Sequence, residues 1–398
     1  MKNSNYLKII IIICLISSLA RFVLDCYLPS LPAIASVRNT GEQYAQFTLT
    51  IYLLGFSISQ LFYGPISDVY GRKKVILLGL IIFAIGNLLC TICHSKDLLV
   101  LGRLIAGIGA GACGVLNRAI ANDCFTGEEF AKVWSYTTNT LVITLCVAPV
   151  IGGYIEEIAG WRGNFALSTL LVILTLFTLM TFLPETHRNL LSENKTIKVK
   201  KILKDYCTII TTREFILGSL CYAFAFAGLI AYFQVSPILF IEHLHLTPFR
   251  YGLCAAIIAL NYLAGGMIVN RFVKRLGTKK LLCIGIFLLI IGGISLLITS
   301  VNQNVTIFAI LFSSSIYVIG ARIVIPNAIA GSMKNLSHLN GSTSAVLGFV
   351  QMAISSLVSL LLSLFDNTSS IPLSGFLLLL GLLSLSVLYF TRKMRDAI

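Results

Sequence analysis

The chain has 398 residues, of which 57% are hydrophobic and only 12% are charged, and its mean hydropathy is +0.90. An average globular protein is about 25% charged, so a soluble domain of this size would lack the charge to cover its surface. The composition therefore excludes a soluble enzyme, a disordered chain and a disulfide-rich secreted domain, and it predicts an all-α integral membrane protein. The formal net charge of +14 would also fit a nucleic-acid binder, so the positions of the basic residues decide its meaning.

Apolar runs of about 20 residues, the length that spans a bilayer, recur along the whole chain. They predict twelve transmembrane helices, and this even number places both termini on one side of the membrane. The predicted spans cover residues 7–28, 45–66, 75–93, 98–120, 133–155, 163–183, 215–240, 249–270, 281–300, 304–326, 341–364 and 371–391.

The basic residues gather on the side of the two termini. By the positive-inside rule this side is cytoplasmic, and we expect a multi-pass protein of the cell inner (cytoplasmic) membrane with both termini in the cytoplasm. The net charge is then mostly a topology signal and a contact with anionic lipid, worth about 1 kcal/mol per residue. No polar domain interleaves basic and aromatic residues, so nucleic acid is not an expected partner. The terminal side carries Lys2, Lys8, Arg72, Lys73, Lys74, Lys132, Arg188, Lys195, Lys198, Lys200, Lys201, Lys204, Arg213, Arg271, Lys274, Arg275, Lys279, Lys280, Lys334, Arg392, Lys393 and Arg395; the other side carries Arg38, Lys96, Arg162 and Arg250.

The sequence offers no pattern for a resident cofactor. The eleven cysteines are scattered singly through the spans, where Cys usually acts as a small apolar residue. No His, Cys and carboxylate cluster has metal-ligand spacing, and no Walker motif indicates ATP as the direct energy source. We expect neither a metal nor a cofactor.

The longest polar stretch inside the chain, near 184–214, falls at its midpoint, with six predicted spans on each side. The second span is followed by Gly64-Pro65-Ile66-Ser67-Asp68 and Gly71-Arg72-Lys73-Lys74. The eighth span is followed by Gly266-Met267-Ile268-Val269-Asn270-Arg271 and Gly277-Thr278-Lys279-Lys280. This weak repeat indicates a duplication. We expect an N-terminal six-helix half at 1–184, a cytoplasmic linker at 185–214 and a C-terminal six-helix half at 215–398.

The stretch from Gly64 to Lys74 resembles the G-x-x-x-D-x-x-G-R-[KR] signature between spans two and three of major facilitator transporters. The resemblance implies the major facilitator fold and a conformational latch formed by Gly64, Asp68, Gly71 and Arg72. The glycines permit close packing and a tight turn, and Asp68 can pair with a basic residue or cap a neighbouring helix N-terminus.

Two further stretches resemble signatures of the same superfamily. Leu101-Gly102-Arg103, followed by a Gly-rich face, resembles the fourth-span signature. Ala148-Pro149-Val150-Ile151-Gly152-Gly153 resembles the G-P-x-x-G-G signature of antiporters, with Ala148 in place of the first Gly. Pro149, Gly152 and Gly153 predict a bend and a packing notch, and a simple kink is the alternative.

Matching stretches in both halves narrow the resemblance to the Bcr/CflA multidrug resistance group. This resemblance implies a drug:proton antiporter that exports drugs or other small amphipathic compounds by alternating access. The stretches are Asp25–Pro32, Arg118–Asp123, Gly228–Tyr232 with Ser236-Pro237, Ile325–Ala328 and Gly341–Gln351.

Asp25 is the one acidic residue that lies clearly within a predicted span. An ionised Asp there costs about 2.5–3.5 kcal/mol on insertion scales, and such residues usually have a role. Burial favours the neutral carboxyl and a nearby cation favours the carboxylate, so a state-dependent distance to Arg103 would switch the protonation of Asp25. We expect Asp25 and Arg103 to couple transport to protons. The alternative is structural, because Arg21 lies i,i+4 from Asp25, and a permanent pair would make Asp25 an anchor.

Arg322 interrupts the tenth predicted span near its cytoplasmic end. It either snorkels to the surface or joins Arg21 and Arg103 in making the substrate cavity favourable to anions. The second alternative makes a specific anionic metabolite, such as a carboxylate siderophore, the rival substrate, exported or imported. The candidate cavity residues are Arg21, Tyr27, Tyr136, Tyr222, Tyr232, Asn261, Arg322 and Gln351, although tyrosines on such helices also serve in packing or in the interfacial belt.

A membrane receptor or membrane-bound enzyme is the hypothesis from a different class. It would need an extramembrane domain or a buried catalytic cluster, and the sequence shows neither. We expect no enzyme activity. The expected partners are a small-molecule substrate, protons and the lipid bilayer, with the monomer as the expected state.

Overall fold

The computed structural model describes residues 3–36, 41–187, 199–302, 305–333, 340–365 and 369–393. Within these ranges every regular element is a helix. Ten helices are long and apolar enough to cross a membrane. The prediction of an all-α membrane fold is confirmed.

The helices follow the predicted spans closely because each is a continuous apolar segment. The elements are α1 (Asn3–Cys26), the 3-10 helix η1 (Leu28–Ser30), α2 (Leu31–Ser36), α3 (Glu42–Tyr70), α4 (Arg72–Ile92), α5 (Lys96–Cys124), α6 (Gly127–Phe182), α7 (Val199–Thr211), α8 (Arg213–Pro237), the π-helix η3 (Ile238–His243), α9 (Pro248–Val301), α10 (Ile307–Met333), α11 (Asn340–Ser363) and α12 (Ile371–Lys393).

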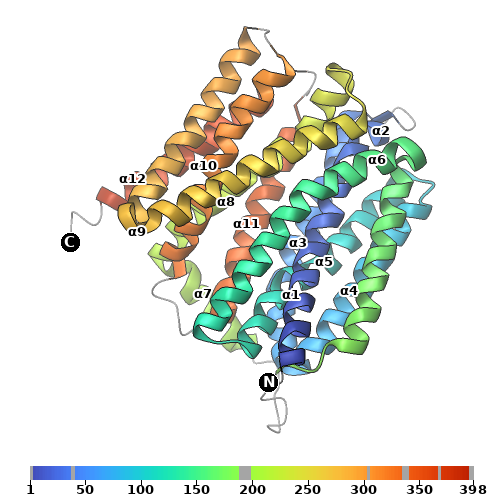
Figure 1. Ribbon diagram of the computed structural model, residues 1–398, viewed down its shortest axis with the longest axis vertical. Helices are drawn as coiled ribbons and strands as arrows, with labels where there is room; N and C mark the ends of the chain where they lie inside the picture. Colours follow the sequence, from blue (N-terminus) through green and yellow to red (C-terminus); the bar gives the residue numbers. More distant parts are fainter. Residues whose placement is uncertain are drawn as a thin grey trace.

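Two of these helices each contain two crossings. At 1.5 Å per residue, α6 and α9 would be about 80 Å long if straight, well over twice the thickness of a bilayer core. Each is interrupted by a glycine with positive φ, Gly160 at 67° in α6 and Gly277 at 74° in α9. Figure 1 shows both helices turning back on themselves. The ten long helices therefore make the twelve predicted crossings.

The weak sequence repeat corresponds to a repeated turn. Gly71, between α3 and α4, has a φ of 97°, and Gly277 occupies the matching turn of α9 with a φ of 74°. Both conformations are accessible to glycine and strained for other residues. We call the side of the molecule with these two turns the basic side, and the side with the Gly160 turn the opposite side.

The crossing helices form two groups, which Figure 1 shows as neighbouring bundles in blue to green and in yellow to red. In the first group α5 packs against α3 and α4, while α6 packs against α1 and α4; in the second, α8 packs against α10, α11 and α12, and α9 packs against α10 and α12. The groups meet along two main seams, α3 against α11 and α6 against α9.

The predicted linker at 185–214 contains a helix. Residues 199–211 form α7, which packs against α8 and α11. Its Ile209 is fully buried, while Lys200 and Lys204 are exposed. The linker residues 188–198 lie outside the described ranges, as do seven of the basic residues used to predict orientation: Lys2, Arg38, Arg188, Lys195, Lys198, Lys334 and Arg395.

Candidate functional site

Asp25 lies near the end of α1 and is paired within its own helix. Its Oδ2 accepts a hydrogen bond from Arg21 Nε at 2.6 Å, and its side chain is 1% exposed. Among the described residues, Asp25 Oδ1 has no hydrogen-bond partner. Asp25 is also the one Asp or Glu in the described chain that is buried as a residue. The i,i+4 pair considered from the sequence is therefore present, as a buried carboxylate held by one partly exposed arginine.

Arg103, on α5, is fully buried and lies against aromatic rings. Its guanidinium carbon is 4.3 Å from the ring centre of Tyr27 and 4.4 Å from that of Tyr52, with Phe165 at 5.8 Å. Its Nε donates to the Thr48 carbonyl at 3.4 Å, and neither Nη has a hydrogen-bond partner in the described chain. The electron-rich ring faces thus take the place of a carboxylate. The structure does not bring Arg103 and Asp25 into an ion pair.

The candidate cavity residues divide into two sets. The hydroxyl of Tyr222 lies beside Arg118 and Gln351, with Tyr262 nearby, and the guanidinium of Arg322 lies 4.9 Å from the Tyr262 ring. Tyr222, Arg322 and Gln351 are thus connected through two residues outside the predicted set. Sequence reasoning did not include Arg118 among the candidates; the available signal was an arginine near the end of an apolar span.

The other candidates are placed elsewhere. Tyr27 is buried against Arg103 and shares a hydrogen bond with the Thr48 hydroxyl. Tyr232 is buried against Phe233. Tyr136 is 53% exposed on α6. Asn261 donates to Ser315 Oγ at 2.9 Å. Arg21 remains with Asp25, so these residues do not form one cluster.

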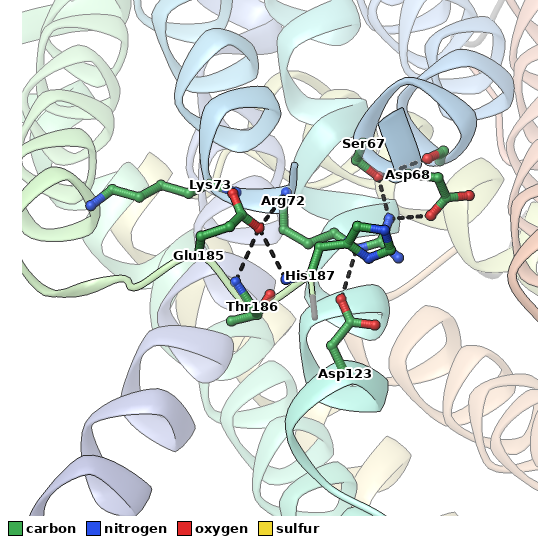
Figure 2. A network of polar contacts seen from close by, with 9 residues as sticks. Ser67, Asp68, Arg72, Lys73, Asp123, Glu185, Thr186 and His187 are labelled. Carbon is green, nitrogen blue, oxygen red and sulfur yellow. Dashed lines mark hydrogen bonds and ion pairs between the residues drawn. The ribbon is translucent and has the colours of Figure 1, made fainter. Parts of the chain in front are cut away.

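The latch residues form a polar network on the basic side (Figure 2). The guanidinium of Arg72 contacts Asp68 Oδ1 at 2.6 Å, Asp123 Oδ2 at 2.9 Å and Ser67 Oγ at 2.5 Å. Arg72 is buried, whereas 59% of the Asp68 side chain is exposed. Asp123 was not in the predicted latch, although it closes the network from α5.

The helix-capping role considered for Asp68 belongs to Glu185. The Glu185 carboxylate accepts hydrogen bonds from the backbone N–H of Arg72 at 2.9 Å and of Lys73 at 3.2 Å, at the start of α4 (Figure 2). The first N–H groups of a helix lack intrahelical acceptors, and a negative charge there is stabilised by the helix dipole. Asp68 precedes the turn and points to Arg72 instead, so a residue distant in sequence supplies the cap.

The prediction of unusually close helix packing at Gly64 is wrong. A Cβ on Gly64 would lie 3.7 Å from a Val115 side-chain carbon, an ordinary contact. The close approach of α3 to α5 occurs at Gly55, where a Cβ would lie 2.6 Å from the Leu104 carbonyl oxygen. Gly71 behaves as predicted, because its positive φ makes the turn into α4.

The antiporter-like stretch of α6 makes contacts between the two bundles. A Cβ on Gly153 would overlap the Pro248 carbonyl of α9, and one on Gly152 would overlap the Cys26 carbonyl of α1. From the other side, a Cβ on Gly252 would lie 2.6 Å from the carbonyl oxygen of Pro149. The sequence predicted a bend and a notch; the structure shows that the notch accommodates the partner helix.

A hydrogen bond closes the same seam. The backbone N–H of Phe249 donates to Glu157 Oε1 at 3.0 Å, linking α9 to α6. These contacts all lie toward the opposite side of the molecule.

The α3–α11 seam is polar and long. The hydroxyls of Thr50 on α3 and Ser359 on α11 lie 2.6 Å apart. Gln234, on α8, bridges the two helices by donating to Gln46 Oε1 at 2.9 Å and to the Ser359 carbonyl at 3.0 Å. Farther along α3, Gln60 donates to the Gly348 carbonyl at 3.4 Å. Residues 50 and 60 are about 15 Å apart along a helix, so α3 and α11 stay in contact over at least this length.

One side-chain hydrogen bond satisfies a backbone carbonyl of α3 that has no donor within the helix. Pro65 has no N–H, so the Leu61 carbonyl lacks its usual intrahelical donor. The hydroxyl of Tyr206, on α7, donates to this carbonyl at 2.9 Å. The helix within the linker is thereby attached to the helix that leads into the latch.

Among the described residues, no group of three or more His, Cys, Asp or Glu could hold a metal ion.

Comparisons with known proteins agree with this architecture. The chain is 30% identical over 88% of its length to an uncharacterised MFS-type transporter, YdgK, of Bacillus subtilis (87% of that protein is covered). It is 26% identical over 90% of its length to the bicyclomycin resistance protein homolog of Haemophilus influenzae (89% covered). The fold matches the xylose transporter XylE of E. coli, solved in a partially occluded inward open conformation, with a TM-score of 0.78 and 17% identity over 98% of each chain.

The model of the Major Facilitator Superfamily matches residues 13–360. The resemblance to the Bcr/CflA group is supported by the Haemophilus relative. Together with the helices that cross the membrane, these matches identify a multi-span transporter of small molecules and not an enzyme. The chain therefore belongs to the Major Facilitator Superfamily.

Proposed function

We propose that this transporter exports drugs or other small amphipathic compounds across the cytoplasmic membrane in exchange for protons. The basic side faces the cytoplasm in this proposal, because Arg72, Lys73 and Lys74 lie at its first turn and basic residues gather on the cytoplasmic side of a membrane protein. Support for the substrate comes from the Haemophilus relative, which is named for resistance to bicyclomycin.

The buried pair of Arg21 and Asp25 carries the proposal of proton coupling. As an ion pair it is neutral overall, and a proton on Asp25 would leave Arg21 as an unpaired cation. Arg21 is partly exposed and its guanidinium lies 5.8 Å from the ring of Phe233, on α8 of the other bundle. Protonation of Asp25 would therefore change a charge at the contact between the bundles, which links the proton to their relative position.

The seams support alternating access. Gly153 and Gly252 let α6 and α9 pack closely toward the opposite side. This arrangement fits a state closed to the outside. A ligand or proton that binds one state better than the other shifts the population between them.

The test is substrate flux in everted membrane vesicles with an imposed pH gradient. We expect wild-type protein and Asp97→Asn, an exposed acid on the opposite side, to accumulate a lipophilic substrate in response to the gradient. Asp25→Asn and the double variant Arg21→Gln with Asp25→Asn should lose the response.

The double variant distinguishes a proton-carrying role of Asp25 from a purely structural one. It removes both charges, so no buried cation is left unpaired. If Asp25 is only an anchor, the double variant will fold and respond to the gradient as the wild type does, and that result would overturn the coupling role.

A further inference from the structure

Among the described residues, three arginines inside the spans have no carboxylate partner. Arg21 pairs with Asp25, but in the part of the chain that the structure describes no ion pair involves Arg103, Arg118 or Arg322. Arg103 is fully buried among aromatic rings. Arg118 and Arg322 are partly exposed, so a ligand can reach them.

Arg118 comes from the N-terminal bundle and faces the C-terminal one. Its guanidinium lies 5.2 Å from the ring of Trp134 on α6. It also lies beside the hydroxyl of Tyr222, on α8, next to Gln351 on α11. Tyr222 and Gln351 are buried, at 5% and 8% exposure. The cation is therefore at the interface between the bundles.

Arg322, on α10, lies beside a second tyrosine. Its guanidinium lies 4.9 Å from the ring of Tyr262, which itself neighbours Tyr222. Glycines leave room for it: a Cβ on Gly266 would lie 3.0 Å from Arg322 Nε. That Nε is a buried donor without an acceptor in the described chain, and a buried unsatisfied donor is costly.

These residues define an arginine–tyrosine cluster: Arg118, Trp134, Tyr222, Tyr262, Arg322 and Gln351. It brings two guanidinium groups, which only donate hydrogen bonds, to flat aromatic surfaces. Neither guanidinium is neutralised by a carboxylate of the described chain. A planar carboxylate complements such a group, because arginine binds it through two parallel hydrogen bonds, and an apolar ring system would pack against the aromatic rings.

We propose that the transported amphipathic compounds are organic anions, with a carboxylate on a planar apolar body, held between Arg118 and Arg322. This inference rests on the proposed function and names its substrate class. The two arginines belong to different bundles, so a bound anion contacts both and stabilises their approach. A lipophilic cation would meet two unneutralised positive charges at this position.

The experiment measures binding to the purified full-length protein by calorimetry with three matched probes: 2-naphthoate, the neutral 2-naphthamide and 2-naphthylmethylammonium. The anion should bind at least about tenfold more tightly than the amide, and the cation most weakly. Arg118→Gln and Arg322→Gln should each weaken naphthoate binding about tenfold or more and leave naphthamide binding unchanged. Arg250→Gln, on an exposed residue of the opposite side, is the matched control.

Equal affinity for naphthoate and naphthamide, or unchanged naphthoate binding in both arginine variants, would overturn the proposal. Arg118→Lys and Arg322→Lys keep the charge, so partial recovery of naphthoate binding shows that the Gln variants lost charge and not their fold. Naphthamide binding reports the fold independently.

Flux of the same probes in everted vesicles distinguishes this inference from the proposed function. Gradient-driven transport of the cation without anion binding overturns the inference alone. Arginine-dependent anion binding without any gradient-driven flux overturns proton-coupled export and leaves the anion site standing.

Discussion

The hydroxyl of Tyr206 donates a 2.9 Å hydrogen bond to the carbonyl of Leu61, four residues before Pro65. Proline leaves that carbonyl without a helical donor, and a tyrosine from the helix within the linker supplies one. The contact joins α7 to α3 ahead of the turn at Gly71. The segment that connects the two bundles is thereby attached to α3.

Tyr206→Phe should loosen α7 without changing its packing. The variant loses one hydrogen bond, worth about 1 kcal/mol, and a local opening equilibrium changes about fivefold for that free energy. Trypsin cleavage at the exposed residues Lys200 and Lys204 should accelerate by about this factor. Tyr70→Phe, on an exposed tyrosine of α3, should leave cleavage unchanged, and equal rates for both variants would show that the bond does not hold α7.

Gly153→Ala should open the opposite-side seam. Its Cβ would overlap the Pro248 carbonyl, which cannot move away as a flexible side chain can. We expect the population to shift toward a state with α6 and α9 farther apart. Spin labels at Tyr154→Cys and Leu253→Cys, both exposed positions, measure this distance in a background without the eleven native cysteines.

The matched control for that measurement is Gly375→Ala on α12, where a Cβ would meet nothing within 4 Å. Gly375→Ala should give the wild-type distance distribution. A wild-type distribution for Gly153→Ala as well would contradict the role of the notch in closing the seam.

Glu185→Ala should destabilise the start of α4. Two backbone N–H groups lose their acceptor, and the loss of a helix cap costs about 0.5–2 kcal/mol. We expect a lower Tm of the purified protein than for Glu129→Ala, an exposed acid on α6. Glu185→Gln keeps an acceptor and should lose less; identical Tm values for all three variants would exclude a capping role.

Arg103→Lys should destabilise the N-terminal bundle. The guanidinium lies over the rings of Tyr27 and Tyr52 and is weakly hydrated, whereas an ammonium is a strongly hydrated point charge. We expect a loss of about 1–2 kcal/mol, seen as a lower Tm than for Arg250→Lys at an exposed position. An unchanged Tm would show that the rings do not stabilise the guanidinium specifically.

Local patterns predicted much of the fold correctly. Apolar run length identified the crossings, and the paired turns at Gly71 and Gly277 followed from a repeat in sequence. The Arg21–Asp25 contact also followed from i,i+4 spacing. The partner of Arg103 was not predictable in this way, because Tyr52 and Phe165 come from other helices and aromatic rings in apolar spans carry no spacing signal for a cation.

The amino-acid sequence by itself determined the class of protein, the number of crossings, the superfamily signatures and the buried acid with its neighbour on α1, because these depend on composition and on contacts within one helix. Only the tertiary structure decided that Glu185 caps α4, that Gly153 packs against Pro248 and that Tyr206 donates to the carbonyl that Pro65 leaves without a donor. It also decided that Arg118 lies beside Tyr222 and Arg322 beside Tyr262. Each of these contacts joins residues on different helices. Their meeting depends on how the helices pack, which no local pattern encodes.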